Sequence, residues 1–557
     1  MPAATPTPRP TPEQRHAPEQ RHAPDQRHAP DQRHLAEPPA RVGRLSDVIP
    51  APAQVRPTPE VSYQLDPRTA IRTTADPAAR AAGDFLADLL RPATGYPLPV
   101  TDHPPAVADT ARTEPGGGIA LVLAAQEDLG AEGYRLEITA DGVLLTANTG
   151  AGLFHGVQTL RQLLPAEIES AEGRPGPWPL PGGFIVDQPR FPYRGAMLDV
   201  ARHFFGVDDV LRFIDHVSRY KINHLHLHLT DDQGWRIAID AWPRLAEVGG
   251  ATQVDGGPGG HYTADQYRRI VSYAASRHVT VVPEIDLPGH TNAALTAYGE
   301  LAPDGVAPPP YTGTDVGFSS VAVDSDRTYR FITDVLGEIA ALTPGPYLHV
   351  GGDEAFTLTP SAYAAFMRRL QPLVAATGKT IVGWHQLAAS DHAPDRVIQY
   401  WGTATADATV TEAVRQGARV ILSPGNRTYL DMKYTPATPL GKDWAGLIEV
   451  RDAYEWDPGS CLAGVPAEAV LGVEAPLWTE TVVSMEDIEF MLFPRLPAIA
   501  ELGWSPAAGR DWSEFRPRLA RQGVRWQAAG IVFHRSPQVP WAGESAPAAS
   551  RHPELSV

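Results

Sequence analysis

The chain has few of the residues and segments that define several large classes of protein. Its 557 residues include one cysteine, Cys461, which excludes an intrachain disulfide and a cysteine-based metal cluster. No apolar run approaches the ~18 residues that a membrane-spanning helix needs. The first residues, MPAATPTPRPTPEQ, also lack the apolar segment of a secretory signal. We therefore expect no membrane partner and no recognisable export signal, which leaves a cytoplasmic location or export by an unrecognised route.

Basic residues are too few to give the chain a positive surface. Lys and Arg together number 47 against 65 Asp and Glu, and the formal net charge is −18. Nucleic-acid phosphates require a basic surface, so a nucleic-acid partner is not expected, and the negative charge is more simply explained by solubility. Hydrophobic residues make up 43% of the chain, which is ample for large cores. The length allows several domains, although one α/β barrel alone can take about 250 residues.

A six-residue repeat occupies residues 12–34, as PEQRHA, PEQRHA, PDQRHA and PDQRH. Each unit is polar, contains proline and has no apolar side chain larger than alanine, so it cannot bury a core. The recurring histidine could suggest metal binding, but nothing in the repeat would fix the ligands in space. We predict a disordered low-complexity tail over residues 1–46, and a short C-terminal tail over residues 541–557.

Residues 47–188 combine strands and helices without strict alternation, which is typical of a small α+β domain. Residues 77–90 and 152–164 have the apolar pattern of helices. Between them, the segment YRLEITADGVLLTA alternates apolar and polar residues around Asp141 and Gly142, which predicts a β-hairpin.

Strands and helices alternate over residues 189–540. Helical patterns separate most of the strand candidates, and Thr263 with Gln266 forms a capping box that starts one of these helices. Eight parallel strands joined by helices favour an α/β fold of the (β/α)8 TIM-barrel type over a doubly wound sheet. The strand candidates are RGAMLDV, HLHLHLT, VTVVPEID, YLHVGGDE, TIVGW, VIQYW, ARVILSP and VLGVEAPLW.

The most informative pair of residues is Asp353 and Glu354, which follow the fourth strand candidate. Gly351 and Gly352 allow a tight turn there, so two carboxyls emerge at the C-terminal end of a strand. Catalytic groups lie at this end of parallel barrels. Two carboxyls so close do not ionise together easily, and one that stays protonated can act as a general acid. The structural alternative is that the pair caps the following helix.

Polar and aromatic residues at the other strand ends favour the functional interpretation. Aromatic rings stack on the C–H faces of pyranose rings, and carboxylates and arginine bind hydroxyl groups, so the set suits a pocket for a neutral sugar. In strand order the residues are Asp199 and Arg202; Asp231 and Asp232; Glu284, Asp286 and His290; Trp384; Trp401; Tyr429 and Asp431; Trp478 and Glu480.

The segment HLHLHLTDD suggests a different chemistry. His224, His226 and His228 alternate along one strand and face the same side, as in metal-dependent barrel hydrolases. A metal-dependent amidohydrolase is therefore an alternative. No further histidine or lysine at later strand ends completes a ligand set, so we expect no metal and assign these histidines to packing and hydrogen bonding.

Eight segments together resemble glycoside hydrolase family 20, the β-N-acetylhexosaminidases, and in particular exo-acting actinobacterial members. The resemblance spans residues 48–506 and implies a TIM barrel preceded by a small α+β domain. It also implies retaining hydrolysis of terminal non-reducing β-linked N-acetylglucosamine or N-acetylgalactosamine residues from an oligosaccharide or glycoconjugate, without a cofactor. The segments are RGAMLDVARHFF, HLHLTDDQGWRI, PEIDLPGHTNAAL, HVGGDEAF, VGWHQ, VIQYWG, YLDMKY and GVEAPLWTET.

The same resemblance implies a role for each site residue. Glu354 would be the general acid, and Asp353 would orient the substrate's acetamido group, whose oxygen attacks the anomeric carbon to give an oxazolinium ion. The remaining assignments are Tyr429 for the acetamido carbonyl, Trp384, Trp401 and Trp478 for the pocket walls, Arg202, Asp431 and Glu480 for the sugar hydroxyls, and Asp231 and His290 as supports of Glu354.

A non-catalytic sugar-binding protein on the same barrel is a further alternative. Such a protein would be expected to lose Asp353 or Glu354, and both are present. The pattern favours neither N-acetylglucosamine nor N-acetylgalactosamine, and predicts no oligomeric state.

Overall fold

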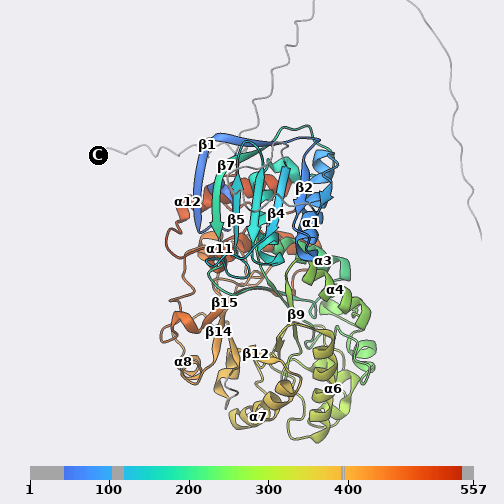
Figure 1. The fold of residues 1–557 in the computed structure, drawn as a ribbon. Helices are drawn as coiled ribbons and strands as arrows, with labels where there is room; N and C mark the ends of the chain where they lie inside the picture. The colour runs from blue at the N-terminus through green and yellow to red at the C-terminus, as the bar shows by residue number, and fades with distance from the viewer. Residues whose placement is uncertain (1–42, 103–117, 391–392, 394, 542–557) are drawn as a thin grey trace, which may run out of the picture. The chain divides into compact units, whose positions relative to one another are not determined.

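The computed structural model describes residues 43–102, 118–390, 393 and 395–541, and Figure 1 shows how their helices and strands are arranged. The tails expected over residues 1–46 and 541–557 lie almost entirely outside these described residues. Among the helices that are described, none has both the length and the apolar character to cross a membrane.

The N-terminal part is built on a mixed seven-stranded sheet in the order β1-β7-β5-β6-β4-β2-β3. The predicted hairpin is confirmed: β5 and β6 pair antiparallel, and the amide of Thr139 donates to the carbonyl of Gly142 over 3.0 Å. Both predicted helices are present: α1 continues four residues beyond its predicted end, and α2 begins two residues earlier and ends one residue earlier than predicted. The elements are β1 (Gln54–Leu65), β2 (Ala70–Thr73), α1 (Pro77–Thr94), β3 (Val100–Thr101), β4 (Gly118–Leu123), β5 (Tyr134–Ile138), β6 (Val143–Ala147), α2 (Gly150–Leu163) and β7 (Trp178–Asp187).

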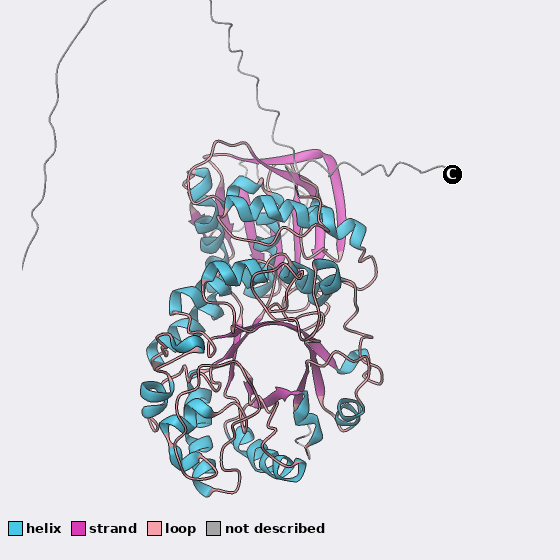
Figure 2. Cartoon of the chain, turned by 180° about the vertical axis from the view of Figure 1, so that it is seen from behind, coloured by secondary structure: helices cyan, strands magenta, loops and turns pink. Residues whose placement is uncertain are grey.

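Eight parallel strands form a closed barrel in the order β10-β11-β12-β13-β14-β15-β8-β9, which confirms the TIM-barrel prediction. Figure 2 shows the ring of strands with helices outside it. Each strand coincides with a predicted one, although β11 is shorter because the chain turns at the glycines that follow it. The strands are β8 (Tyr193–Asp199), β9 (His224–His228), β10 (Thr280–Glu284), β11 (Tyr347–His349), β12 (Thr380–Trp384), β13 (Val397–Tyr400), β14 (Arg419–Leu422) and β15 (Val470–Leu477).

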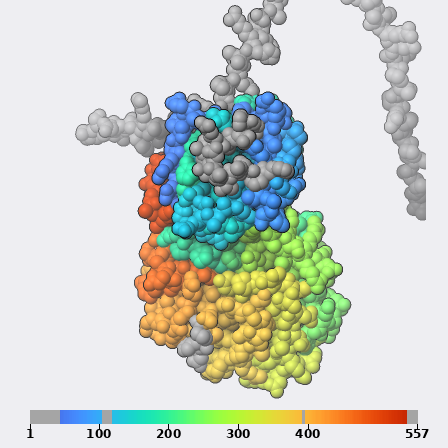
Figure 3. All heavy atoms as spheres, viewed as in Figure 1, coloured from blue at the N-terminus to red at the C-terminus, as the bar shows by residue number. Residues whose placement is uncertain are grey.

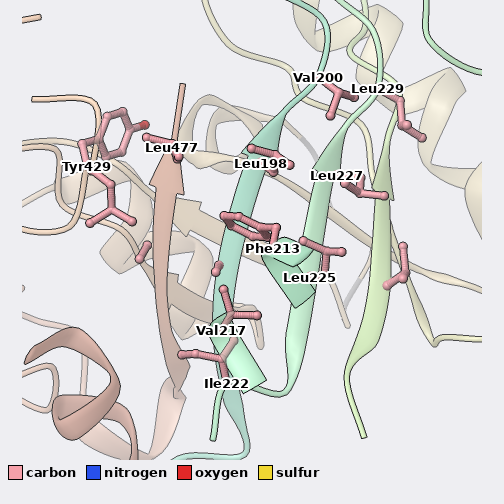
Figure 4. Close-up of a cluster of buried hydrophobic side chains, with 14 of the residues drawn as sticks. Leu198, Val200, Phe213, Val217, Ile222, Leu225, Leu227, Leu229, Tyr429 and Leu477 are labelled. Carbon is pink, nitrogen blue, oxygen red and sulfur yellow. The ribbon is translucent and has the colours of Figure 1, made fainter. Parts of the chain in front are cut away.

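Helices pack on the outside of the barrel through their apolar faces. On α3, Phe213 and Val217 are fully buried against the leucines of β8 and β9 (Figure 4). The Thr263–Gln266 capping box opens α4 as predicted. The helices are α3 (Val207–Ser218), α4 (Ala264–Ser276), α5 (Asn292–Ala297), α6 (Asp326–Leu342), α7 (Pro360–Ala376), α8 (Ala408–Arg415), α9 (Val450–Tyr454), α10 (Met485–Leu492), α11 (Arg495–Trp504) and α12 (Trp512–Ala528). Short helical turns lie at η1 (Leu45–Asp47), η2 (Ala166–Glu169), η3 (Leu245–Gly249), η4 (Val254–Gly256), η5 (Gly299–Leu301), η6 (His385–Ala389) and η7 (Ala467–Ala469).

Segments from the two ends of the described chain lie side by side, as the blue and red surfaces in Figure 3 show. Arg518 on α12 donates to the carbonyl of Val48 over 3.0 Å. On the same helix, Nη1 of Arg525 lies 3.2 Å from Oε1 of Glu169 in η2. The C-terminal helix of the barrel therefore also packs on the N-terminal sheet domain.

The side chains of β9 point alternately to the outside and to the inside of the barrel. Leu225 and Leu227 belong to the core between strands and helices (Figure 4). Because neighbouring side chains on a strand point to opposite faces, His224, His226 and His228 point into the barrel. All three were predicted to share one side, and two of them contact the groups described below.

Candidate active site

A tight turn after β11 presents Asp353 and Glu354 at the C-terminal end of the barrel. Gly351 and Gly352 have positive φ angles of 62° and 95°, a conformation that glycine adopts without strain. A β-carbon on Gly351 would come 1.7 Å from Oδ1 of Asp286, so no larger residue fits there. The amide of Gly352 donates to that same carboxyl oxygen over 3.1 Å. Asp286 therefore fixes the turn from which both acids project.

The two acids share one neighbour, His290, but differ in exposure. Nε2 of His290 lies 3.4 Å from Oε2 of Glu354 and 3.8 Å from Oδ2 of Asp353. The side chain of Asp353 is 11% exposed and that of Glu354 is 24% exposed. Burial raises the pKa of Asp353 to about 6; His290 opposes the rise and Glu354 adds to it. Asp353, the more buried of the two, therefore keeps its proton to a higher pH than an exposed aspartate does.

Asp231 forms an ion pair with Arg202 and contacts the ring nitrogen of His290 that does not face the two acids. Oδ1 of Asp231 lies 3.1 Å from Nδ1 of His290, and Oδ2 lies 2.9 Å from the guanidinium of Arg202. Burial raises the pKa of Asp231, but Arg202 and His290 outweigh it and hold that pKa well below its usual range. Burial lowers the pKa of His290, but carboxylates led by Asp231 raise it well above the ordinary value. The charged form of the His290 ring that faces the two acids is therefore favoured.

The polar contacts continue into the barrel through Glu284 at the end of β10. Its Oε2 lies 2.5 Å from Nδ1 of His228 and 2.9 Å from Nε2 of His226. Its Oε1 accepts a hydrogen bond from the indole of Trp384 over 3.0 Å and lies 2.9 Å from His349. Nε2 of His228 lies 2.8 Å from Asp231, which completes a chain of contacts from Glu284 to Glu354. The sequence analysis placed Glu284, Asp231 and Trp384 at strand ends, and His226 and His228 along a strand, but it did not predict this chain of contacts.

Aromatic rings form a connected wall beside the acids. The buried ring of Trp384 lies 5.6 Å from that of Trp478, which lies 6.3 Å from Tyr429. Trp401 and Tyr429 both pack against Trp444, with ring centroids 5.8 and 5.6 Å away. The four aromatic residues predicted for the site therefore meet. Trp444 was not predicted; it lies in a long loop after β14, away from any strand end, and is 52% exposed.

Polar residues complete the site next to this wall. The guanidinium of Arg202 lies 4.9 Å from the ring of Trp478, and Arg202 also pairs with Asp199 over 3.1 Å. Burial raises the pKa of Asp431 well above its usual range, and the negative charge of Glu480 adds to the rise. Among the described residues, the buried polar atoms of the site without a hydrogen-bond partner include Oδ1 of Asp353, Oδ1 of Asp431, Nε of Arg202 and Nε2 of His290. Such atoms are suited to a polar ligand.

Histidines and carboxylates in the barrel also approach one another closely enough to hold a metal ion. One group combines His226, Glu284 and His349, and another combines His290 with Asp353 and Glu354, each with ligand atoms within 4.8 Å. In the first group the histidines lie 2.9 Å from the carboxylate oxygens, so these atoms already satisfy one another. The contacts of His226 and His228 with Glu284 agree with the hydrogen-bonding role predicted for them. His349 was not singled out in the sequence.

A TIM barrel with adjacent acids at its strand ends and an aromatic wall beside them has the architecture of a glycoside hydrolase. Residues 191–361 and 357–507 match the glycosyl hydrolase family 20 catalytic domain, and residues 45–188 match domain 2 of the same family. The chain belongs to glycosyl hydrolase family 20, which confirms the resemblance found in the sequence. Enzymes of this family retain anomeric configuration and use substrate-assisted catalysis.

Several similar proteins match this chain over nearly their whole length. A beta-N-acetylhexosaminidase from Cellulomonas fimi is 42% identical over 506 residues, which is 90% of this chain and 99% of the relative. The solved GH20 beta-N-acetylhexosaminidase from Streptomyces coelicolor A3(2) is 58% identical, with a TM-score of 0.86, over 90% of this chain and 99% of that chain. A mutant Streptomyces plicatus beta-hexosaminidase in complex with product (GlcNAc) has 58% identity, a TM-score of 0.87 and the same coverage.

Proposed function

We propose that the chain removes terminal non-reducing β-linked N-acetylglucosamine or N-acetylgalactosamine residues, with Asp353 and Glu354 as its catalytic pair. One observation carries this assignment: both acids project from a single turn and both approach His290. A protein nucleophile and its acid partner flank the anomeric carbon from opposite sides, with carboxyls about 5 Å apart. In family 20 the acetamido group of the substrate takes the place of that protein nucleophile, so a single turn can carry both acids.

Glu354, the more exposed acid, protonates the glycosidic oxygen as the bond to the leaving group breaks. Asp353 accepts a hydrogen bond from the acetamido N–H, and the acetamido oxygen attacks the anomeric carbon. The positive charge that develops on the resulting oxazolinium ion is stabilised by the Asp353 carboxylate. Water, deprotonated by Glu354, then opens the ring from the face that the leaving group occupied. Two inversions at the same carbon give net retention.

The aromatic wall encloses the acetamido group in this proposal. Trp384, Trp401 and Trp478 surround its methyl group, and the hydroxyl of Tyr429 donates to its carbonyl. The hydroxyl groups of the ring are bound by Arg202, Asp431 and Glu480. Asp231 and His290 act on Glu354 through their contacts. The unpaired buried atoms of Asp353, Asp431 and Arg202 support this assignment, because each gains a partner when the sugar binds.

Paired glycosides test the proposal. The enzyme should cleave a chromogenic β-N-acetylglucosaminide or β-N-acetylgalactosaminide, and turn over the β-glucoside without the acetamido group at least about 10⁴-fold less efficiently. A thiazoline that mimics the cyclised intermediate should inhibit far more tightly than the free sugar. Comparable kcat/KM on the plain glucoside would contradict the mechanism. Loss of activity with a chelator would favour the metal-dependent amidohydrolase instead.

A further inference from the structure

Three arginine side chains converge on a single glutamate where the ends of α2 and α3 approach α12. Glu169 in η2, whose side chain is 4% exposed, pairs with Arg161 of α2. Its carboxylate also lies 3.2 Å from Nη1 of Arg525 on α12, and 3.6 Å from Nη1 of Arg219, which directly follows α3. Burial raises the pKa of Glu169, but the three arginines outweigh it and lower that pKa to about 2. Three guanidinium groups therefore share one carboxylate.

Neighbouring groups offset this positive charge only in part. Asp215 on α3 also attracts Arg161 and Arg219, but its carboxylate lies 3.0 Å from Arg277 and is shared with that residue. Burial lowers the pKa of Arg219, and the positive charge of Arg161 lowers it further. Helix-end carbonyls carry only partial charges, equivalent to about half an elementary charge for a whole helix end. Arg525 donates to three such carbonyls at the end of α2, those of Arg161, Gln162 and Leu164.

A cavity of about 10 Å³ lies among these side chains. The glutamate and all three arginines line it, together with Gln158 of α2. Gln158 is 1% exposed, and its Oε1 is one of the buried atoms of the described chain that have no hydrogen-bond partner; Nε of Arg219 is another. The two ends of a glutamine amide exchange places by a half-turn, so Gln158 can also present its N–H donors. The cavity thus combines excess positive charge with polar groups that lack partners.

We propose that this cavity binds a small inorganic anion, chloride or another halide. A volume of about 10 Å³ accepts a single particle of roughly the size of a water molecule, which excludes phosphate, sulfate and organic anions. The anion reduces the repulsion between Arg161 and Arg219 and accepts a hydrogen bond from the unpaired Nε of Arg219. Buried charges are stable in proteins when they are paired, and the anion supplies the missing partner.

The position of the cavity makes this a structural ion. Its lining comes from α2 and η2 of the N-terminal domain, from the end of α3 and from α12. These segments are distant in sequence, so an anion that contacts them stabilises the junction between the sheet domain and the barrel. Arg219 lies where the chain leads from α3 into β9, at the N-terminal ends of the barrel strands and opposite the catalytic turn.

Bromide identifies the occupant directly, because it replaces chloride and scatters X-rays anomalously. Crystals of the full chain soaked in sodium bromide should show an anomalous peak in the cavity, in contact with Arg219 and Gln158. A cavity that holds only water, or nothing, in bromide would overturn the proposal. A bromide peak without any effect of chloride on stability would indicate an adventitious ion only, which overturns it as well.

Thermal unfolding measures the effect of the anion in solution. Tm is compared in sodium chloride and in sodium gluconate, whose anion is too large for the cavity, at an equal ionic strength of about 0.15 M that keeps screening constant. An anion that binds only the folded state stabilises it, so chloride should raise the Tm of the parent protein by about 1–3 °C.

Arg219→Gln removes one of the converging charges and the unpaired Nε. Its increment in Tm from gluconate to chloride should fall to less than half of the parental increment. In gluconate its Tm should stay within about 1 °C of the parent or exceed it, because repulsion by Arg161 is lost. An equal increment in the variant and the parent would overturn the proposal. If the variant does not fold, the bromide measurement on the parent protein still decides.

Arg190→Gln is the matched control. The side chain of Arg190 is 18% exposed, against 23% for Arg219, and it also pairs with a carboxylate, that of Asp457. Arg190 does not line the cavity, so the control should keep the full chloride increment. If the control loses the increment as well, chloride acts through general charge effects and the proposal is wrong.

Discussion

At the scale of single residues, the difference in exposure between Asp353 and Glu354 separates their chemistry. The more exposed Glu354 can reach a leaving group and later a water molecule, whereas Asp353 faces the enclosed part of the site. His290 lies within reach of both carboxyls, and carboxylates led by Asp231 raise its pKa well above the ordinary value, which favours its charged form. A shared cation lets two adjacent acids act at different steps, since it reduces their mutual repulsion.

Replacing Glu354 by Gln should reveal the general acid through the leaving group. General acid catalysis contributes about 10²- to 10⁴-fold, so turnover of an oligosaccharide should fall by roughly that factor. A dinitrophenyl glycoside, whose leaving group needs no proton, should lose much less in the first step. Initial rates on the two substrates measure the difference. Equal losses would contradict the assignment of Glu354, and Glu412→Gln on the exposed face of α8 provides the control.

Asp353 should control the acidic side of the pH profile. Its pKa of about 6 means that kcat/KM should fall below pH 6 as the carboxylate that stabilises the oxazolinium ion becomes protonated. Asp353→Asn should lower kcat by about 10²-fold or more, and its residual activity should lack this acidic limb. A profile that keeps the same limb in the variant would assign it to another group.

The same pKa has a consequence for stability. Because the folded-state pKa lies above the ordinary value of 3.8, the folded protein binds this proton more tightly than the unfolded chain does. Stability is therefore lost as the pH rises from about 4 to about 6, and Asp353→Asn should avoid that loss. Thermal unfolding at pH 7.5 should give a higher Tm for the variant, and the gain should shrink near pH 4. An unchanged Tm at pH 7.5 would argue against burial as the cause of the raised pKa.

At the scale of elements, β10 and β9 connect the two parts of the site. Glu284 on β10 accepts the indole proton of Trp384 and contacts His226 and His228 on β9, and His228 contacts Asp231. Glu284 is therefore a positioning residue both for the acetamido wall and for the imidazolium beside Glu354.

Glu284→Gln tests this double role. Displacing groups in a catalytic site by about 1 Å can cost roughly 10²-fold in rate, and we expect a loss of kcat/KM of that size. Thiazoline binding should also weaken, because Trp384 loses a charged acceptor, and the pH profile should shift, because the histidines lose their counter-charge. Circular dichroism would check folding, and Glu284→Asp should restore part of the activity. An unshifted pH profile with normal thiazoline binding would leave Glu284 with a purely structural role.

Much of the barrel was predictable because parallel strands are buried on both faces and appear as short apolar runs. All eight strands were predicted, and residues such as Tyr429 and Trp478 at their ends do meet in one site. The contact chain through Glu284 was not predictable, because it depends on the register between strands that are distant in sequence. Trp444 comes from a loop, whose conformation has no periodic pattern.

At the scale of the whole molecule, buried charges join the N-terminal sheet domain to the barrel. Lys221, in the turn between α3 and β9, lies 2.9 Å from Asp187 of β7 and donates to the hydroxyl of Tyr134 over 3.1 Å. The indole of Trp504 on α11 donates to the same aspartate over 2.9 Å. Arg194 at the start of β8 lies 2.6 Å from Glu132. These contacts lie at the N-terminal side of the barrel strands, opposite the catalytic turn, so they serve stability.

Lys221→Met should therefore destabilise the enzyme with little effect on its chemistry. Lys221 is 1% exposed and Asp187 is fully buried, so the variant leaves a buried carboxylate that keeps its hydrogen bonds but has no counter-charge, which typically costs about 3–5 kcal/mol. Arg415→Met breaks an exposed pair with Glu412, and should cost about 0–1 kcal/mol. Chemical denaturation measures both changes, and kcat on a small glycoside at 25 °C should stay near the parental value in each. If the two variants lose similar free energies of unfolding, the buried pair does not hold the sheet domain to the barrel. If Lys221→Met instead lowers kcat while the protein is still folded, the interface also affects the geometry of the active site.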